Sequence, residues 1–186
     1  FTMANEQYRY LENQGGGNHL IIRNDTINSS SFLNQDNVLN TWYGGLDLAV
    51  RNMVQPVADS FETGQVSQQE LTWEPVFWRP TNLHDFSEVV ADETRVNQSG
   101  SSRAFSLSLA DVVRLSGIGH AFPNHEQRLS GNGNAWWLRT PAGIVEGAER
   151  AWRVTRDYND GNLGQLRSGH AITSWLHIRP ALIVHQ

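Results

Sequence analysis

The stretch of sequence that decides the fold lies in the last third of the chain. It begins with Trp-Trp-Leu-Arg-Thr-Pro at residues 136–141 and continues with Ala-Trp-Arg-Val at residues 151–154. The turn sequence Asn-Asp-Gly-Asn follows at residues 159–162, and Ile-Arg-Pro-Ala-Leu-Ile-Val closes the stretch at residues 178–184. Apolar segments on either side of an Asp-Gly turn are typical of β-hairpins. This order of segments predicts a run of strands.

We predict that these segments form a β-meander, with strands over residues 135–139, 151–156, 163–167 and 178–184. The Asn and Gly residues of the turn supply the positive φ angles that a tight hairpin needs. Pro180 cannot donate a hydrogen bond to a neighbouring strand. The last strand is therefore expected at the edge of a sheet or at a bulge.

The same segments resemble the C-type-lectin-like domains of bacterial surface proteins. They are similar in particular to a family whose members end in a WWLR(S/T)P … V … DG … (V/I)RPAL pattern. The same general fold is used by formylglycine-generating enzymes and by the variable proteins of diversity-generating retroelements. The resemblance implies a single α+β domain over residues 1–186, in which a small twisted antiparallel sheet packs against two helices. It implies function only as a class, because this architecture displays many different loops on one scaffold.

The resemblance covers residues 104–184 and, more weakly, residues 41–57, and does not extend to the long loops. The chain also departs from the commoner family pattern. Ala142 stands where a Gly often follows the Pro, and residues 144–150 form a longer insertion before the next strand. The functions that relatives carry in their loops therefore cannot be transferred to this chain.

The N-terminal part predicts a hairpin followed by a helix. Residues 7–11 and 19–23 have the composition of strands, and Gly15, Gly16 and Gly17 form a turn between them. From Leu46 onwards, apolar residues recur at helical spacing, and Pro56 closes that helix.

A second helix is expected to begin after Ser108. The Ser108 side chain can accept a hydrogen bond from the first turn, and Asp111 adds a negative charge near the positive end of the helix dipole. Gly117 would end this helix. Residues 91–103 and 117–134 are rich in polar residues or in Gly and Pro, and are expected to form exposed loops.

Composition excludes several classes of function. The chain has no Cys, which rules out disulfides, thiolate nucleophiles, zinc–thiolate sites and the cysteine chemistry of the formylglycine-generating enzymes. All 14 basic residues are Arg, so lysine-dependent catalysis and Lys–Asn isopeptide cross-links are excluded as well. These Arg residues are spread along a chain of net charge −5, which argues against a nucleic-acid partner. No apolar run approaches the length of a membrane span, so we expect no membrane insertion by this domain.

No motif predicts catalysis, a metal or a cofactor. The oxygen-rich segment that starts at Asp157 places its Gly one position too early for an EF-hand, and Ser168 stands where that loop needs Glu. The seven His residues show no metal-ligand spacing, and no P-loop, dinucleotide or nucleophile-elbow pattern is present. We expect no catalytic residue, no metal and no cofactor.

Two further patterns are read as incidental. The acidic pairs Asp92-Glu93 and Glu146 with Glu149 lie in expected loops and are read as solvated surface. Three segments, including Asn28-Ser29-Ser30, match the N-glycosylation acceptor pattern. In a bacterial domain, which the resemblance implies, these matches are read as chance.

The recurring motif implies a structural role for its conspicuous residues. An Arg inside such a motif usually fixes loops through hydrogen bonds to carboxylates or carbonyls. Trp136 and Trp137 adjoin on a strand, so they point to opposite faces and one of them is expected in the core. The expected structural set is Trp136, Trp137, Arg139, Pro141, Arg179 and Pro180.

The favoured function is a non-enzymatic, adhesin-like binding module of an exported bacterial or phage-encoded protein, located outside the cell or at its surface. Its partner would be a protein or a glycan on a host or neighbouring cell. The expected contact surface consists of the late loops, which are residues 157–162 and 169–177, together with the loop over residues 120–134. The ligand-binding candidates are Asp157, Tyr158, Asn159, Asp160, Asn162, His170, Trp175 and His177. A structural pilus or stalk subunit is one alternative, and an enzyme of the formylglycine-generating-enzyme-like fold is another.

Overall fold

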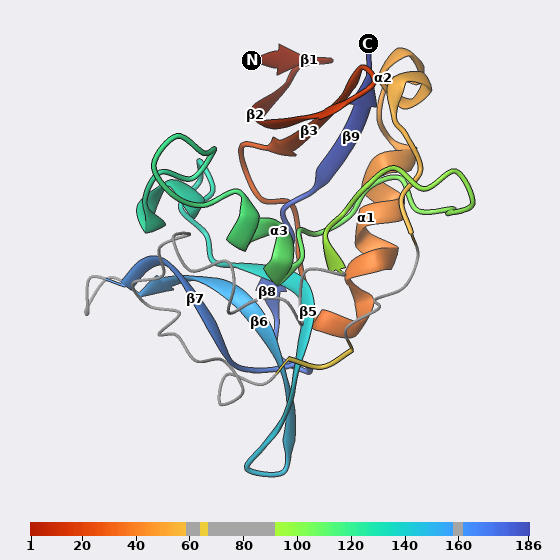
Figure 1. Cartoon of the computed structure of the whole chain (residues 1–186). Helices are drawn as coiled ribbons and strands as arrows, with labels where there is room; N and C mark the ends of the chain where they lie inside the picture. The colour runs from red at the N-terminus through yellow and green to blue at the C-terminus, as the bar shows by residue number, and fades with distance from the viewer. Residues whose placement is uncertain (59–63, 67–91, 158–161) are drawn as a thin grey trace.

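A computed structural model describes residues 1–58, 64–66, 92–157 and 162–186, which form an α+β arrangement with two sheets (Figure 1). One sheet has the strand order β1-β2-β3-β9, and the other has the order β4-β8-β5-β6-β7. The strands are β1 Thr2–Met3, β2 Glu6–Gly15, β3 Asn18–Arg23, β4 Ser29–Ser30, β5 Trp136–Val145, β6 Ala148–Asp157, β7 Asn162–Ala171, β8 Leu176–His177 and β9 Ala181–His185. The helices are η1 Phe32–Asn34, α1 Gln35–Gly44, α2 Leu48–Met53, α3 Leu109–Arg114 and η5 His125–Arg128.

The predicted N-terminal hairpin is confirmed. Strands β2 and β3 pair in antiparallel fashion, with Tyr8 opposite Arg23 and Asn13 opposite His19. The turn residue Gly16 has a φ of 61°, a conformation in which a side chain would be strained. The turn therefore follows from local sequence.

The β5–β6–β7 part of the predicted meander is also confirmed, with longer strands than expected. The insertion over residues 144–150 forms the tip of the β5–β6 hairpin. Glu146 and Gly147 make its turn, with φ angles of 53° and 75°. Figure 1 shows this hairpin extending away from the rest of the domain.

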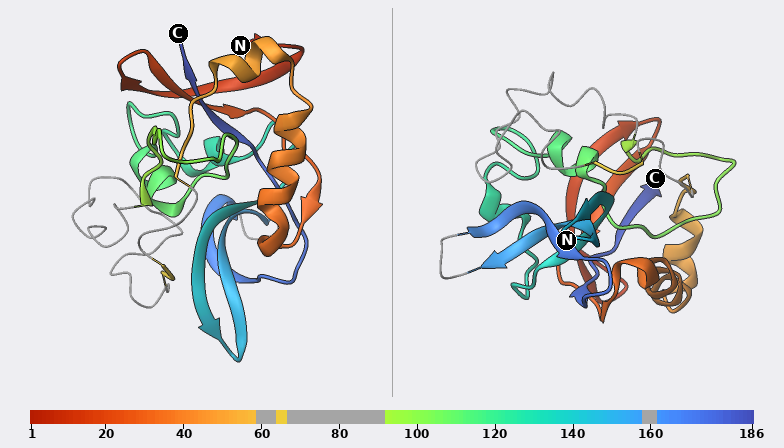
Figure 2. Two further views of the ribbon diagram at one scale, coloured as in Figure 1. Left: turned by 90° about the vertical axis from the view of Figure 1, so that its right-hand side faces the viewer. Right: turned by 90° about the horizontal axis from the view of Figure 1, so that it is seen from below.

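The prediction for the last strand was wrong in its partner. β9 does not continue the meander but pairs with β3 in the other sheet, with Leu20 opposite Ile183. Both ends of the chain consequently lie at the same end of the molecule (Figures 1 and 2). Pro180 directly precedes β9, which is an edge strand as expected. Leu176 and His177 form β8, which lies between β4 and β5 and runs parallel to β5.

Strand β5 runs between two hydrophobic clusters. Trp136 packs with Trp152 and Phe122 in one cluster, whereas Trp137 packs with Ile178 and Leu182 in the other. Both Trp136 and Trp137 are fully buried, so both faces of the strand are covered rather than one. Their indole N–H groups donate to backbone carbonyls, which satisfies the polar part of each ring.

The helix that begins after Ser108 is confirmed as α3. Ser108 Oγ accepts from the Asp111 amide, and Asp111 accepts in return from the Ser108 amide, which is a capping box. The helix expected from Leu46 is the shorter α2, capped by Asp47. Helix α1 was not predicted, because its apolar face is narrow and interrupted by Asn and Thr.

The two expected loops are less exposed than predicted. Asp92 and Thr94 are buried, so the interpretation of Asp92 as solvated surface was wrong. Thr94 donates through its amide and its hydroxyl to the Asp111 carboxylate, at 2.7 and 2.5 Å. The second loop contains η5, whose Arg128 is buried. Both segments are held by contacts with residues distant in sequence.

Candidate functional site

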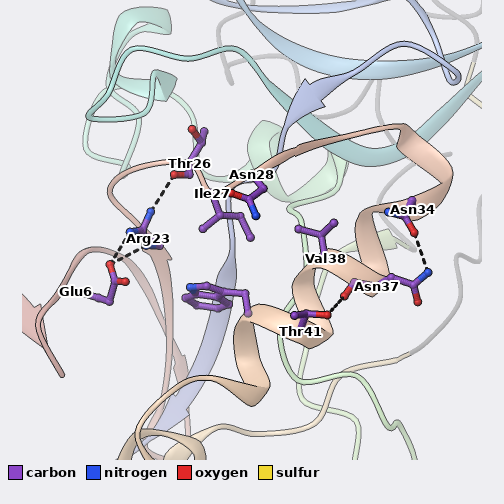
Figure 3. Close-up of a pocket in the computed structure, with 10 residues that line it drawn as sticks. Glu6, Arg23, Thr26, Ile27, Asn28, Asn34, Asn37, Val38 and Thr41 are labelled. Carbon is purple, nitrogen blue, oxygen red and sulfur yellow. Dashed lines mark hydrogen bonds and ion pairs between the residues drawn. The ribbon is translucent and has the colours of Figure 1, made fainter.

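A groove of about 540 Å³ lies between helix α1 and the segment that follows strand β3 (Figure 3). Its lining comes from three parts of the chain: the start of β2, the end of β3 with the residues after it, and one face of α1. The described lining residues are Glu6, Arg23, Thr26, Ile27, Asn28, Asn34, Asn37, Val38, Thr41 and Trp42.

Helix α1 and its N-cap residue Asn34 line the groove with a row of polar side chains. Asn34, Asn37 and Thr41 recur at three- and four-residue intervals, which places them on the same side of the helix. Asn34 donates from Nδ2 to Ser30 Oγ at 3.0 Å, and Asn37 donates from Nδ2 to Asn34 Oδ1 at 2.8 Å. This chain of hydrogen bonds orients the amides. The Asn37 Oδ1 atom has no partner within the described part of the chain and can accept a hydrogen bond from a ligand.

The apolar residues of the groove belong to the core. Ile27, Val38 and Trp42 are partly buried and pack against the cluster that contains Trp137. Their positions are therefore fixed by packing, while their remaining surface faces the groove. A ligand would meet hydrogen-bonding groups and an aromatic side chain together.

One end of the groove carries its charged residues. Arg23 and Glu6 form an ion pair, with 2.6 Å between Arg23 Nη2 and Glu6 Oε2 (Figure 3). The Glu6 charge also acts on Tyr8, whose pKa is raised to about 12, mainly because the phenol is buried and secondly because of Glu6. The two charges of the pair cancel, so the described lining of the groove has no net charge.

The structure separates the late-loop residues that were expected to share one face. Asp157 and Asn162 pair at one end of the β6–β7 hairpin, whereas His170 pairs with Ala151 near the other end. Asn162 and His170 are eight positions apart along the strand, which corresponds to roughly 26 Å. Tyr158, Asn159 and Asp160 lie outside the described residues. The described candidates of this hairpin therefore lie toward its two ends, and their role in binding stays a prediction.

The loop over residues 120–134 lies near the first of these ends. His125 Nδ1 is 2.6 Å from the carbonyl oxygen of Leu163, one residue into β7. Arg156 near the end of β6 also donates to Asn134 Oδ1 at 3.2 Å. This loop thus contacts the Asp157–Asn162 end of the hairpin, and its Asn132 and Asn134 side chains also contact Thr26.

The remaining candidates differ in how far they are exposed. His170 is half-buried beside the ring of Trp137, and its Nδ1 lies 2.9 Å from Arg153 Nη1. Burial, and then the charge of Arg153, lowers the pKa of His170. His177 Nδ1 lies 3.1 Å from the carbonyl oxygen of Ile27 and so contacts the backbone of a residue that lines the groove. Trp175, by contrast, is 72% exposed.

The two Arg residues of the recurring motif both contact backbone carbonyls. Arg139 donates from Nη2 to the Asp92 carbonyl at 2.7 Å. Arg179 is fully buried and lies over the ring of Trp136, with 5.4 Å from its Cζ to the ring centroid. Pro141 lies on β5 opposite Ala151, and its carbonyl accepts from the Val66 amide.

Sequence reasoning missed the groove. Asn28 was considered only as part of a glycosylation pattern, and α1 was not expected at all. The spacing of Asn34, Asn37 and Thr41 indicates a polar helix face, but only once residues 35–44 are known to be helical. The contribution of Glu6 and Arg23 depends on the pairing of β2 with β3, which brings them to the same end of the groove.

In comparisons with known proteins, no protein-family model, no curated protein and no solved structure matches the chain. In the described part of the chain, no helix is long and apolar enough to cross a membrane.

Folding is expected to need no metal ion. Within the described ranges, no three His, Asp or Glu residues are grouped so that they could hold one. The thermal unfolding midpoint should therefore be the same with and without EDTA. A midpoint that falls by more than a few degrees on chelation, and recovers when calcium is added back, would contradict this expectation.

Proposed function

We propose that this chain is a non-enzymatic ligand-binding module of an exported bacterial or phage-encoded protein, and that it binds a glycan in the groove between α1 and residues 26–28. The observation that carries the proposal is the chemistry of the lining. Asn28, Asn34 and Asn37 offer amides, Thr41 offers a hydroxyl, and Trp42 offers an aromatic surface. Sugars combine many hydroxyl groups with apolar C–H faces, and they match this mixture.

The size of the groove supports a small ligand. Its volume of about 540 Å³ falls within the range of roughly 300–1,000 Å³ that is usual for small-molecule sites. Side-chain amides can both donate and accept, which suits hydroxyl groups that do the same. Because packing and the Ser30–Asn34–Asn37 hydrogen bonds already fix the lining, a ligand would lose little free energy in ordering it.

The carboxylate content of the described groove lining supports binding rather than hydrolysis. Glycoside hydrolases generally use two carboxyl groups on either side of the scissile bond. Glu6 is the one carboxylate among the described lining residues, and it is held in the ion pair with Arg23. This arrangement supplies neither a free general acid nor a second carboxylate.

We also propose the C-type-lectin-like fold as the architecture of this module. The mixed α+β content, the small sheets and the predicted helices α2 and α3 support that assignment. The groove would then be formed by the scaffold itself rather than by the late loops.

Replacing Asn37 by Ala should weaken glycan binding about fivefold. The substitution removes one hydrogen-bonding amide, and a neutral hydrogen bond contributes about 1 kcal/mol. Asn40→Ala is the matched control, since Asn40 is an exposed residue of the same helix that does not line the groove. A glycan array would first identify the ligand, and calorimetric titration would then compare the two variants with the parent.

Both variants should melt at or slightly above the parental temperature, because Ala favours helix more than Asn does. Equal affinity of Asn37→Ala and the parent for the array ligand would contradict the groove as the binding site.

A second candidate function, recognition of a protein partner or of a second subunit, is favoured by the exposed indole of Trp175. Exposed Trp residues often dominate protein interfaces, and their removal commonly costs about 2 kcal/mol or more of binding. If Trp175→Ala weakens binding of a protein partner or of a second subunit while Asn37→Ala does not weaken glycan binding, the protein-binding alternative replaces the glycan proposal.

A further inference from the structure

We infer that the groove selects neutral over acidic saccharides, and that Glu6 sets this selectivity by occupying the anion-binding edge of Arg23. The inference rests on the proposed function, since it names the class of glycan that the same groove would take. It follows from the contacts of the Arg23 guanidinium.

The Arg23 guanidinium is held from two sides. Its Nη1 donates to the carbonyl oxygens of Asp25 and Thr26, each at 3.0 Å. Its Nε and Nη2 both point to Glu6 Oε2, at 2.8 and 2.6 Å. The Nε–Nη2 edge is the edge with which Arg usually binds a carboxylate in a two-point contact. In this groove the protein's own carboxylate already occupies it.

The register of the sheet builds this ion pair. Tyr8 on β2 lies directly opposite Arg23 on β3, and Glu6 precedes Tyr8 by two residues. Residues two apart on a strand point to the same face, so Glu6 and Arg23 are diagonal neighbours on that face. Their side chains are 33% and 17% exposed, which shields the pair from solvent more than an ordinary surface ion pair.

This geometry disfavours an acidic sugar. A ligand carboxylate at this end of the groove would meet the charge of Glu6 and would find the Nε–Nη2 edge of Arg23 occupied. The other end of the groove, with Asn34 and Asn37, offers amides instead of a cation (Figure 3). A neutral sugar can use those amides without displacing the ion pair.

The test is the charge-removing substitution Glu6→Gln in the full chain. The two carbonyl contacts of Nη1 keep the Arg23 guanidinium in place, while Nε and Nη2 lose their carboxylate. Binding of glycans that carry a uronic or sialic acid should rise at least tenfold. Binding of the neutral array ligand is measured alongside, so that the ratio of acidic to neutral affinity reports the change in selectivity.

Two further variants identify the cause of any gain. Glu149→Gln removes one negative charge from an exposed position that does not line the groove, and it should leave both affinities at parental values. The double variant Glu6→Gln/Arg23→Gln should lose the gained binding of acidic glycans. Thermal melting of each variant shows that it is folded.

The outcomes separate this inference from the function on which it rests. If the parent binds no glycan, neutral or acidic, the proposed function is wrong. If the parent prefers acidic glycans, or if folded Glu6→Gln gains no affinity for them, glycan binding stands and the selectivity role of Glu6 is overturned. A gain that persists in the double variant would also overturn it, because it would not depend on Arg23.

Discussion

Replacing Asp111 by Ala should lower the free energy of unfolding by about 3–5 kcal/mol, the usual cost of removing one partner from a buried charge network. The Asp111 carboxylate is fully buried and accepts from the amide and hydroxyl of Thr94 and from the amide of Ser108. Arg114 Nη2 lies 3.1 Å from it. The Ala variant would leave these donors buried without an acceptor and would remove the capping box of α3.

The stabilisation by Asp111 should also depend on pH. Burial alone raises the pKa of its carboxyl, but the charges of Arg139 and Arg114 and the hydrogen bonds of Thr94 and Ser108 outweigh burial. The folded-state pKa therefore lies below the ordinary value of 3.8. The contribution of Asp111 is fully present above that value, and it is lost as the pH falls through the lower folded-state pKa.

Urea unfolding at neutral pH and at successively more acidic pH values would measure both effects. Asp47→Ala is the control, since Asp47 is exposed and caps the short helix α2. Its loss should cost about 1 kcal/mol. If Asp111→Ala costs no more than Asp47→Ala at neutral pH, the network around α3 contributes little to stability.

Replacing Arg179 by Ala should lower the free energy of unfolding by about 2–4 kcal/mol. Arg179 Nε donates to the Arg23 carbonyl at 2.9 Å, and Nη1 donates to the carbonyls of Arg128 and Leu129 at 2.8 and 3.2 Å. These bonds tie the segment after η5 to the end of β3. The Ala variant would leave carbonyl groups unpaired and a void beside Trp136.

The expected effect of Arg179→Ala is on stability and not selectively on binding. Arg95→Ala is the matched control, because the Arg95 side chain is 49% exposed and its ion pairs are at the surface. Such pairs contribute about 0–1 kcal/mol. An Arg179→Ala protein that melts like the parent but no longer binds its glycan would show that Arg179 is a binding residue instead.

Local features of the fold could be predicted from the sequence because nearby residues determine them. The Gly15–Gly17 turn needs backbone conformations that Gly adopts without strain, and the capping box of α3 joins residues three apart. The β5–β6–β7 strands were found in the same way, from apolar segments and turn signals. Helix α1 was missed, because its stability comes from packing of Leu39, Val38 and Trp42 on the core rather than from a strong local pattern.

By itself, then, the sequence determined the mixed α+β class, the hairpins, the cap of α3, and the absence of cysteine and lysine chemistry. The tertiary structure alone decided that β9 pairs with β3, that α1 faces residues 26–28 across a groove, and that Glu6 meets Arg23 there. The physical reason is the range of the interactions. Turns and caps depend on hydrogen bonds between residues a few positions apart, whereas strand partners and grooves depend on burying apolar surface between segments far apart in the chain.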